Sequence, residues 1–389
     1  MGSENIFYDA PGKFQNTRFE RIHNVTFPSA AEASKLVAEE IATGIRSCIN
    51  KPYILGLATG SSPIGVYKEL VSLHKKEGLS FKNVITFNLD EYFPIQRDDL
   101  LSYNHFMSYH LFDHIDIPKE NINIPEGDIS SKDIYSYCNE YEKKINDLGG
   151  LDFQLLGIGR TGHIGFNEPG ANKNSVTRVV SLDFITKEDA AGDFNGIDNV
   201  PDKAITMGVY SIMRAKRIVL LAWGHKKSKK VAKSIEGPIS SMVPASFLQA
   251  HNNTSIILDE EASSELTRYK TPWLVTDCKW TDSLRKKAIA WLCNKLQKPI
   301  LKLTQRDYKE NGLSDLLETK GSGYELNIWM FNQLQRSITG WPGGKPNHSD
   351  ENRPERAVPA KKRVLIFSPH PDDDVISMGG TLARLIDQN

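Results

Sequence analysis

The sequence has few of the features that mark secreted, membrane-spanning or nucleic-acid-binding proteins. Its 389 residues include only four cysteines, which are scattered and form neither a C-x-x-C pair nor a zinc-finger spacing. We therefore expect a reduced, cytoplasmic protein. The N-terminal residues contain no charged segment followed by an apolar run, and no window approaches the ~20 apolar residues that span a bilayer.

The sequence also lacks an excess of charge of either sign. Lysine plus arginine equals aspartate plus glutamate, with 48 residues in each group. This balance provides no general attraction to nucleic acid or to anionic membranes, so we expect neither as a partner. Any anion that the protein binds must therefore be held at a local site.

What the chain does contain is an alternation of short apolar strands with helical patterns. The segments YILGLATG, VITFNLDEY, LDFQLLGIG and KRIVLLAWG are apolar along their whole length rather than at every second position. Such strands are typical of a parallel sheet that is buried on both faces. The sequence therefore predicts an α/β domain over residues 1–270, with a doubly wound, mainly parallel sheet and helices on both faces.

The remainder of the chain differs in composition. Residues 271–340 have a helical pattern without a chemical motif, which predicts a helical extension. Residues 341–362 are rich in proline, glycine and charge, as is typical of a linker. Residues 363–389 predict one strand, a loop and the start of a helix, a unit too small to fold alone. We expect this unit to be the truncated beginning of a second α/β domain.

Polar residues with anion-binding chemistry follow two of the predicted strands. In an open parallel sheet the carboxyl ends of the strands share one edge, where ligands bind. The turn formed by Gly60, Ser61 and Ser62 precedes a helix, and its backbone N–H groups suit a phosphate, although such a turn can also serve only as a connection. Lys227 follows a later strand and can reach the same phosphate, although most lysines of GHKKSKK must lie on a solvated helix face.

Two further segments carry groups for proton transfer. Asp90 ends a predicted apolar strand at the same edge, where its carboxylate can act as a base or simply cap the next turn. In GIGRTGHIGFNEPG, His163 can change protonation near neutral pH, and Glu168 can hold its imidazole in one tautomer. No helix follows this glycine pattern, which excludes a dinucleotide-binding motif. His110 and His114 lack an HExxH motif, and we interpret them as surface or packing residues.

These segments together resemble the glucosamine-6-phosphate deaminase family. The matching segments, which occur in the order of that family between about residues 30 and 270, are FNLDEYF, SYNHFM, LFDHIDIP, LGIGRTGHIGFNEPG and VPDKAITMGV. The resemblance implies an enzyme that converts glucosamine 6-phosphate to fructose 6-phosphate and ammonia, without a metal or organic cofactor. It also implies a homo-oligomer, with a hexamer as one form.

The resemblance assigns a phosphate-binding role to one group of residues. In this family the phosphate is held by a turn and a lysine that match Gly60, Ser61, Ser62 and Lys227. Many members also place an arginine on the phosphate, in a segment that here reads DAAGDFNG and contains none. Arg178 matches an arginine of the allosteric site of some members, but Val180 replaces the neighbouring lysine. We therefore do not predict that regulation.

The resemblance also assigns the catalytic roles. Asp90 matches the proton-abstracting base, and His163 matches the histidine that assists opening of the sugar ring, with Glu168 as its partner. Thr161 stands where many members have aspartate or asparagine. Because threonine can only hydrogen-bond, Glu168 must orient and charge the imidazole in this chain.

The C-terminal segment resembles a different family, the zinc-dependent sugar de-N-acetylases. The motif HPDDD, followed by GGTLA, matches the first metal motif of that family. In it, His370 and Asp373 match zinc ligands, and Asp372 matches the general base. The third ligand would lie beyond Asn389, so we expect no complete zinc site and no deacetylase activity from this segment.

Three alternatives to the deaminase stay open at this point. A 6-phosphogluconolactonase, which is a hydrolase of related architecture, shares the glycine phosphate loop, but the pair FNLDEYF and GHIGFNEPG favours the deaminase. A non-catalytic sugar-phosphate sensor would normally carry a DNA-binding segment, and residues 1–30 are short and not basic. A fused deacetylase–deaminase would need the rest of the second domain.

Overall fold

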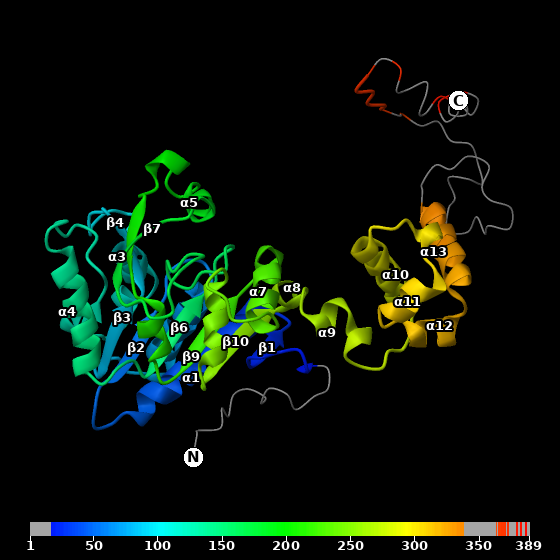
Figure 1. The fold of residues 1–389 in the computed structure, drawn as a ribbon. Coiled ribbons are helices and arrows are strands. Elements are labelled where there is room, and N and C mark those ends of the chain that lie inside the picture. Colours follow the sequence, from blue (N-terminus) through cyan, green and yellow to red (C-terminus); the bar gives the residue numbers. More distant parts are fainter. Residues whose placement is uncertain are drawn as a thin grey trace. The chain divides into compact units, whose positions relative to one another are not determined.

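The computed structural model describes residues 17–337 and, near the C-terminus, residues 363, 365–370, 372, 379, 382 and 386. The chain divides into two compact units between Cys278 and Lys279. Figure 1 shows the elements of both units in sequence colours. Among the described residues, every helix is too short or too polar to cross a bilayer.

The first unit is built around a seven-stranded sheet in which every neighbouring pair of strands is parallel. The strands lie in the order β1-β10-β9-β6-β2-β3-β5. Their bounds are β1 (Asn24–Phe27), β2 (Tyr53–Leu57), β3 (Val84–Asn88), β5 (Ile122–Asn123), β6 (Phe153–Gly157), β9 (Ile218–Ala222) and β10 (Thr254–Asp259). The predicted doubly wound, mainly parallel sheet is confirmed.

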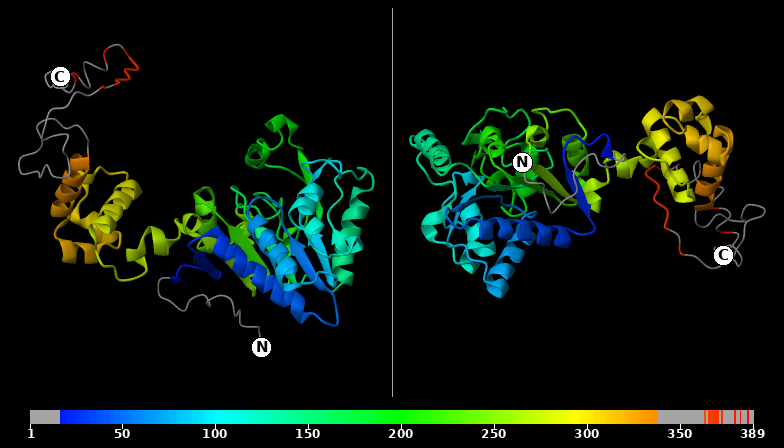
Figure 2. Two further views of the ribbon diagram at one scale, coloured as in Figure 1. Left: turned by 180° about the vertical axis from the view of Figure 1, so that it is seen from behind. Right: turned by 90° about the horizontal axis from the view of Figure 1, so that it is seen from below.

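Helices cover both faces of this sheet, because alternate residues of each strand enter different apolar cores. Leu55 and Leu57 of β2 belong to the core that faces α1 and α2, whereas Ile54 belongs to the core that faces α4 and α7. The view from below in Figure 2 shows α1 and α2 together on one side. The α-helices of this unit are α1 (Ala30–Ser47), α2 (Ile64–Glu77), α3 (Tyr103–His110), α4 (Ile134–Asp147), α5 (Phe184–Ala190), α6 (Val209–Met213), α7 (Ser228–Ile235), α8 (Glu260–Ser263) and α9 (Thr267–Lys270). Its 3-10 helices are η2 (Phe112–His114), η3 (Lys119–Asn121), η4 (Ile197–Asn199), η5 (His225–Lys227), η6 (Pro244–Ala250) and η7 (Pro272–Leu274).

A second, antiparallel sheet corrects one prediction about Asp90. It contains β4 (Asp90–Phe93), β8 (Lys203–Thr206) and β7 (Arg178–Ser181), in the order β4-β8-β7. The prediction of a single strand ending in Asp90 is wrong, because β3 ends at Asn88 and Asp90 begins β4 in the other sheet. Only Leu89 separates the two strands, and the polar residues Asn88 and Asp90 on either side of it also suit the end of a single strand, so the sequence does not locate the break.

The order of the strands creates a switch point at the carboxyl edge of the large sheet, and this place is called the crevice below. From β2 the chain continues to β3 and β5 on one side, whereas β6, β9 and β10 lie on the other side. Where strand order reverses in this way, the loops leaving the two central strands diverge and open a ligand site between them. The loops that leave β2 and β6 contain the turn at 59–62 and the segment 158–168, so the topology brings these segments to one place.

The second unit is a group of short helices. Its elements are α10 (Asp282–Leu296), η8 (Ile300–Lys302), α11 (Gln305–Glu310), α12 (Ser314–Lys320) and α13 (Gly323–Ser337). Its buried side chains include Ile289, Leu292, Tyr308 and Leu326. The predicted linker at 341–362 lies outside the described residues, as does most of the predicted unit at 363–389, including Asp373.

Candidate active site

The glycine turn and the predicted lysine meet at the crevice, although they come from different strands. Lys227, in η5 after β9, donates from Nζ to Ser62 Oγ at 3.0 Å. Ser62 is buried, and its carbonyl accepts a hydrogen bond from Trp223 Nε1 at 3.0 Å. Gly60 has a φ of +90°, which favours glycine, and the space in front of its backbone is open. The structure therefore brings Ser62, Lys227 and the open turn together.

One lysine and the N-terminus of α2 are the groups beside the 59–62 turn that can attract an anion. Burial lowers the pKa of the Lys227 ammonium, while the carboxylates of Asp189 and Asp259 act in the opposite direction. Asp259 also accepts the backbone N–H of Gly224 at 3.0 Å, which fixes the loop that carries the lysine. In the described part of the chain no side chain caps the N-terminus of α2, so its first N–H groups and the positive end of its dipole face the turn. Together the lysine and the N–H groups of the helix supply the positive charge and the hydrogen-bond donors that a phosphate needs.

Asp90 lies at the same edge in an almost fully buried position. Its side chain is 5% exposed, and the hydroxyl of Thr59 hydrogen-bonds its carboxyl group. Burial, reinforced by the charge of Glu91, raises the pKa of Asp90 to about 8. Such a carboxyl group can take up and release a proton near neutral pH. Thr59 was not predicted to contact Asp90, because the break between β3 and β4 that aims the carboxyl at the turn is invisible in the sequence.

The histidine-bearing loop packs directly on Asp90. A Cβ placed on Gly165 would lie 3.3 Å from Asp90 Oδ2 and 2.9 Å from Thr206 Oγ1. Thr206 pairs with Asp90 across the antiparallel sheet, and its hydroxyl accepts the backbone N–H of Phe166 at 3.0 Å. Gly165 therefore permits a close approach that a larger residue would block, and Asp90 shares one site with the loop of His163.

His163 and Glu168 form a hydrogen-bonded pair in this loop. His163 Nδ1 lies 2.9 Å from Glu168 Oε2, and Thr161 Oγ1 lies 3.0 Å from each of these atoms. The hydroxyl of Thr186, on α5, donates to Glu168 Oε1 at 2.5 Å. All these contacts of the imidazole use Nδ1. Because a carboxylate only accepts hydrogen bonds, Nδ1 carries the proton, and Nε2 points away from Glu168.

The surroundings of Glu168 keep its carboxylate ionised. Burial alone would raise its pKa, but hydrogen bonds and the charge of His163, together with the hydroxyls of Thr186 and Thr161, lower the pKa below its usual value. Thr161 thus hydrogen-bonds both His163 and Glu168, as a threonine at this position can. Thr186 was missed, because nothing in the segment around it indicates that α5 reaches over the loop.

Arg160, in the same loop, is a second residue that the sequence analysis missed. Its Nη2 donates to Glu188 Oε2 at 2.6 Å, and its Nε lies 2.6 Å from Asp189 Oδ1. Both carboxylates belong to α5, so Thr186 is not the only contact of that helix with the loop. Its place within GIGRTGHIGFNEPG was a usable signal, but an arginine beside a loop turn also fits an ordinary surface position.

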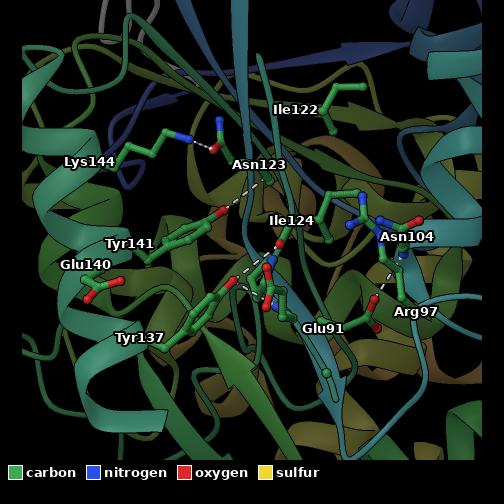
Figure 3. Close-up of a pocket in the computed structure, with 13 residues that line it drawn as sticks. Glu91, Arg97, Asn104, Ile122, Asn123, Ile124, Tyr137, Glu140, Tyr141 and Lys144 are labelled. Atoms are coloured by element: carbon green, nitrogen blue, oxygen red, sulfur yellow. Dashed lines mark hydrogen bonds between the residues drawn. The ribbon is translucent and has the colours of Figure 1, made fainter. Parts of the chain in front are cut away.

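Glu91 faces a different region from Asp90. Its carboxylate accepts backbone N–H groups of Tyr92 and Tyr103 at 2.9 Å and of Asn104 at 3.0 Å, and so ties β4 to the start of α3. Figure 3 shows the pocket beside it, which has a volume of about 300 Å³. Residues lining this pocket include Glu91, Arg97, Asn104, Tyr137, Tyr141 and Lys144. None of the predicted site residues lines it, so this pocket is separate from the crevice.

Three other residues singled out in the sequence lie away from the catalytic groups or support them indirectly. His110 ends α3, whereas His114 lies in η2 beyond a break at Leu111, so the two histidines do not share one helix. Among the described residues, no three histidine, cysteine, aspartate or glutamate side chains are grouped as a metal site. Arg178 donates to Asn167 Oδ1 at 3.0 Å and thereby supports the GHIGFNEPG loop.

The crevice lies within a segment that matches a known family model. Residues 28–257 match the model described as glucosamine-6-phosphate isomerases/6-phosphogluconolactonase. A glucosamine-6-phosphate deaminase-like protein of Bacteroides thetaiotaomicron is 52% identical over 374 residues, which cover 96% of this chain and 56% of that relative. The chain thus spans about half the length of that relative. A glucosamine-6-phosphate deaminase of Oceanobacillus iheyensis is 47% identical over 234 residues, which cover 60% of this chain and 92% of that relative.

Solved structures share the same architecture. One, described as a monomeric glucosamine-6-phosphate deaminase, has a TM-score of 0.61 and 42% identity and covers 63% of this chain and 100% of its own. A 6-phosphogluconolactonase from Trypanosoma cruzi has a TM-score of 0.52 and 21% identity, and covers 63% of this chain and 97% of its own. At that identity the second likeness concerns the fold alone.

Proposed function

Because this chain belongs to the family of glucosamine-6-phosphate isomerases and 6-phosphogluconolactonases, we propose that it converts glucosamine 6-phosphate and water to fructose 6-phosphate and ammonia. Relatives named as deaminases, at 47% identity or more, support this choice within the family. The observation that carries the proposal is the meeting of three groups at one crevice: the Ser62–Lys227 pair, the buried Asp90 carboxyl, and the His163–Glu168 pair. An assay of ammonia release from glucosamine 6-phosphate tests it directly, and purified protein that released none would contradict it.

The first step of the proposed mechanism is binding and ring opening. The phosphate on C6 binds the turn of Gly60, Ser61 and Ser62 and the ammonium of Lys227. This remote anchor positions the reacting end of the sugar, since binding energy away from the chemistry orients C1 and C2. His163 Nε2, directed toward the sugar by the contacts of Nδ1, then exchanges a proton with the ring oxygen and gives the open-chain aldehyde.

The second step moves a proton between neighbouring carbons. The C1 carbonyl makes the C2 proton acidic, and the ionised Asp90 carboxylate removes it to give an enolamine. Protonation of that enolamine at C1 produces a ketimine at C2. Water adds to C2, the C–N bond breaks, and ammonia leaves with fructose 6-phosphate as the other product. The carbonyl itself stabilises the negative charge in this scheme, so the proposal needs no metal or organic cofactor.

Lys227→Ala should raise the KM for glucosamine 6-phosphate by about tenfold to a hundredfold, because a charge-assisted hydrogen bond to the phosphate contributes ~1.5–3 kcal/mol. The kcat should fall less, since the lysine is far from C1 and C2 in the proposed pose. Steady-state kinetics of ammonia release measure both constants. Lys229→Ala, an exposed lysine on the same basic segment, is the matched control and should leave KM unchanged. An unaltered KM in Lys227→Ala would remove this lysine from the phosphate site.

Gly159→Ala should lower kcat by roughly tenfold or more. A Cβ at position 159 would lie 2.1 Å from His163 Nε2, so the imidazole has to move from the position that its hydrogen bonds define. Gly192→Ala is the control, because a Cβ there meets no atom within 4 Å. Wild-type kcat in Gly159→Ala, with both variants folded, would mean that the observed position of the imidazole is not needed for turnover.

Several properties beyond the reaction stay proposals. A homo-oligomer is implied by the family resemblance, although one solved relative is described as monomeric. A cytoplasmic location rests on the scattered cysteines and the metabolic substrate. Zinc chemistry would belong to a complete de-N-acetylase domain, of which HPDDD at 370–374 would supply the ligands His370 and Asp373 and the base Asp372. Family matching of residues 28–257 concerns the first unit alone and lends this tail no support.

A further inference from the structure

One carboxylate on α5 pairs with Arg160 and also acts electrostatically on Lys227. Asp189 Oδ1 lies 2.6 Å from Arg160 Nε, and the charge of the same carboxylate acts on the Lys227 ammonium. The neighbouring Glu188 also pairs with Arg160, but its charge is not among the interactions that affect Lys227. Asp189 is therefore the member of α5 that connects both positive groups.

We propose that Arg160 binds the substrate phosphate together with Lys227, and that the Asp189 carboxylate competes with that phosphate for the two cations. This inference rests on the proposed function, because it names a further residue of the same substrate site. A phosphate and a carboxylate both bind a guanidinium through paired oxygen atoms, so the two anions are chemically interchangeable partners for Arg160.

The positions of the two cations in the fold support a shared anion. Arg160 follows β6 and Lys227 follows β9, and these strands are direct neighbours with Gly157 opposite Leu221. The loop after β6 also lies close to α7, the helix that follows Lys227, because a Cβ on Gly162 would lie 3.5 Å from Lys230 Cδ. Ser62, which accepts the Lys227 hydrogen bond, also lies beside β6, where a Cβ on Gly157 would be 3.9 Å from the Ser62 Cβ. Arg160 and Lys227 thus follow neighbouring strands at the edge of the sheet where Ser62 also lies.

The exposure of these groups makes exchange of partners feasible. The Arg160 side chain is 33% exposed, and those of Glu188 and Asp189 are 55% and 45% exposed. Ion pairs of this exposure are weak, because water and salt screen them. A dianionic phosphate, held at the same time by Lys227 and the helix terminus, can therefore displace the Asp189 carboxylate from Arg160.

A plainer explanation is that Arg160 only fastens α5 over the loop. The two explanations differ in the sign of one effect. If Arg160 is only a fastener, Arg160→Gln and Asp189→Asn break the same contact and should change substrate binding in the same direction. If Arg160 holds the phosphate and Asp189 competes with it, the two substitutions should change phosphate binding in opposite directions.

The test is titration calorimetry of the full chain with fructose 6-phosphate and with inorganic phosphate, alongside the KM for glucosamine 6-phosphate. Arg160→Gln should weaken binding of both phosphate compounds by about tenfold, and Asp189→Asn should tighten it by roughly threefold to tenfold. Asp198→Asn, which removes an exposed carboxylate from η4, is the control and should stay within about twofold of wild type. Thermal melting curves confirm that each variant is folded.

Each outcome bears on one proposal separately. Weaker binding in Arg160→Gln with tighter binding in Asp189→Asn supports the competition, even if the protein released no ammonia and the deaminase proposal failed. Changes of the same sign in both variants, or wild-type binding in Arg160→Gln, would overturn it while leaving the deaminase activity standing. Because inorganic phosphate needs no sugar contacts, its titration separates the phosphate corner from the rest of the site.

Discussion

Asp90→Asn should lower the rate of ammonia release from glucosamine 6-phosphate by ~10²-fold or more, which is the usual scale for a general base. Asparagine keeps the size of the side chain and its acceptor oxygen, so the hydrogen bond with Thr59 can persist. It cannot accept the proton from C2. Binding of fructose 6-phosphate should be preserved, because the phosphate corner is built from other residues.

The pH dependence of the wild-type enzyme should reflect the same carboxyl group. Burial, reinforced by the charge of Glu91, raises the pKa of Asp90 to about 8. A base works in its ionised form, so kcat/KM should rise as the pH rises through this region and fall as the pH falls below it. The residual activity of Asp90→Asn should lack this limb of the profile. Rates measured between about pH 6 and 9 on both proteins make the comparison.

Two controls separate chemistry from folding in this experiment. Asp98→Asn removes an exposed carboxylate from the loop after β4 and should leave the rate unchanged. The melting temperature of Asp90→Asn should not fall when it is measured above the pKa of about 8, because the ionised carboxylate then costs stability in its buried position and asparagine removes that charge. Turnover in Asp90→Asn equal to that of wild type would exclude Asp90 as the base.

His163→Asn should produce the second large loss, with kcat reduced by ~10²-fold, because the proposed ring opening loses its proton-transfer group. Glu168→Gln should show a smaller loss of roughly tenfold, since glutamine can still hydrogen-bond the imidazole but no longer stabilises its charged form. Single-substitution kinetics on glucosamine 6-phosphate measure both. The graded order of the two effects is the expected result.

His114→Asn provides the control for removing an imidazole. His114 is exposed and hydrogen-bonds only the backbone carbonyl of Tyr109 among the contacts described. Its replacement should leave kcat and KM unchanged. If His163→Asn retained wild-type kcat, or if Glu168→Gln were the more damaging change, the assignment of ring opening to His163 Nε2 would be wrong.

Much of the fold was predictable because the strands of the large sheet are apolar along their whole length. Burial on both faces imposes this pattern, and it separates β2, β6 and β9 clearly from the helices between them. The small antiparallel sheet was not predictable in the same way. Its strand β4 follows β3 after a single residue, and only the pairing of Asp90 with Thr206, more than a hundred residues later, distinguishes it as a separate strand.

In the candidate site, contacts within one motif were predictable from the sequence, whereas contacts between distant segments were not. Groups within one short motif, such as His163 and Glu168, reveal their proximity through sequence spacing. Groups from distant segments, such as Thr59 with Asp90 and Thr186 with Glu168, meet only because of how two sheets and α5 are placed in space. The sequence contains no local pattern that expresses such a meeting. Arg160 lies inside the glycine-rich motif, but its ion pairs with Glu188 and Asp189 depend on the same placement of α5.

The single residue between the two sheets has a consequence for how related substrates could be accommodated. Leu89 donates its N–H to the carbonyl of Leu57, in β2 of the large sheet, at 3.0 Å. Its own carbonyl accepts the N–H of Met207, which follows β8 of the small sheet, at 2.7 Å. These two hydrogen bonds connect the sheets next to Asp90. The position of Asp90 is therefore fixed by both sheets. α5 follows β7, which is the edge strand of the small sheet on the side away from β4. We therefore expect relatives that use longer or shorter sugar phosphates to differ from this chain mainly in the sequence around α5, and to keep the connection between the sheets at Leu89.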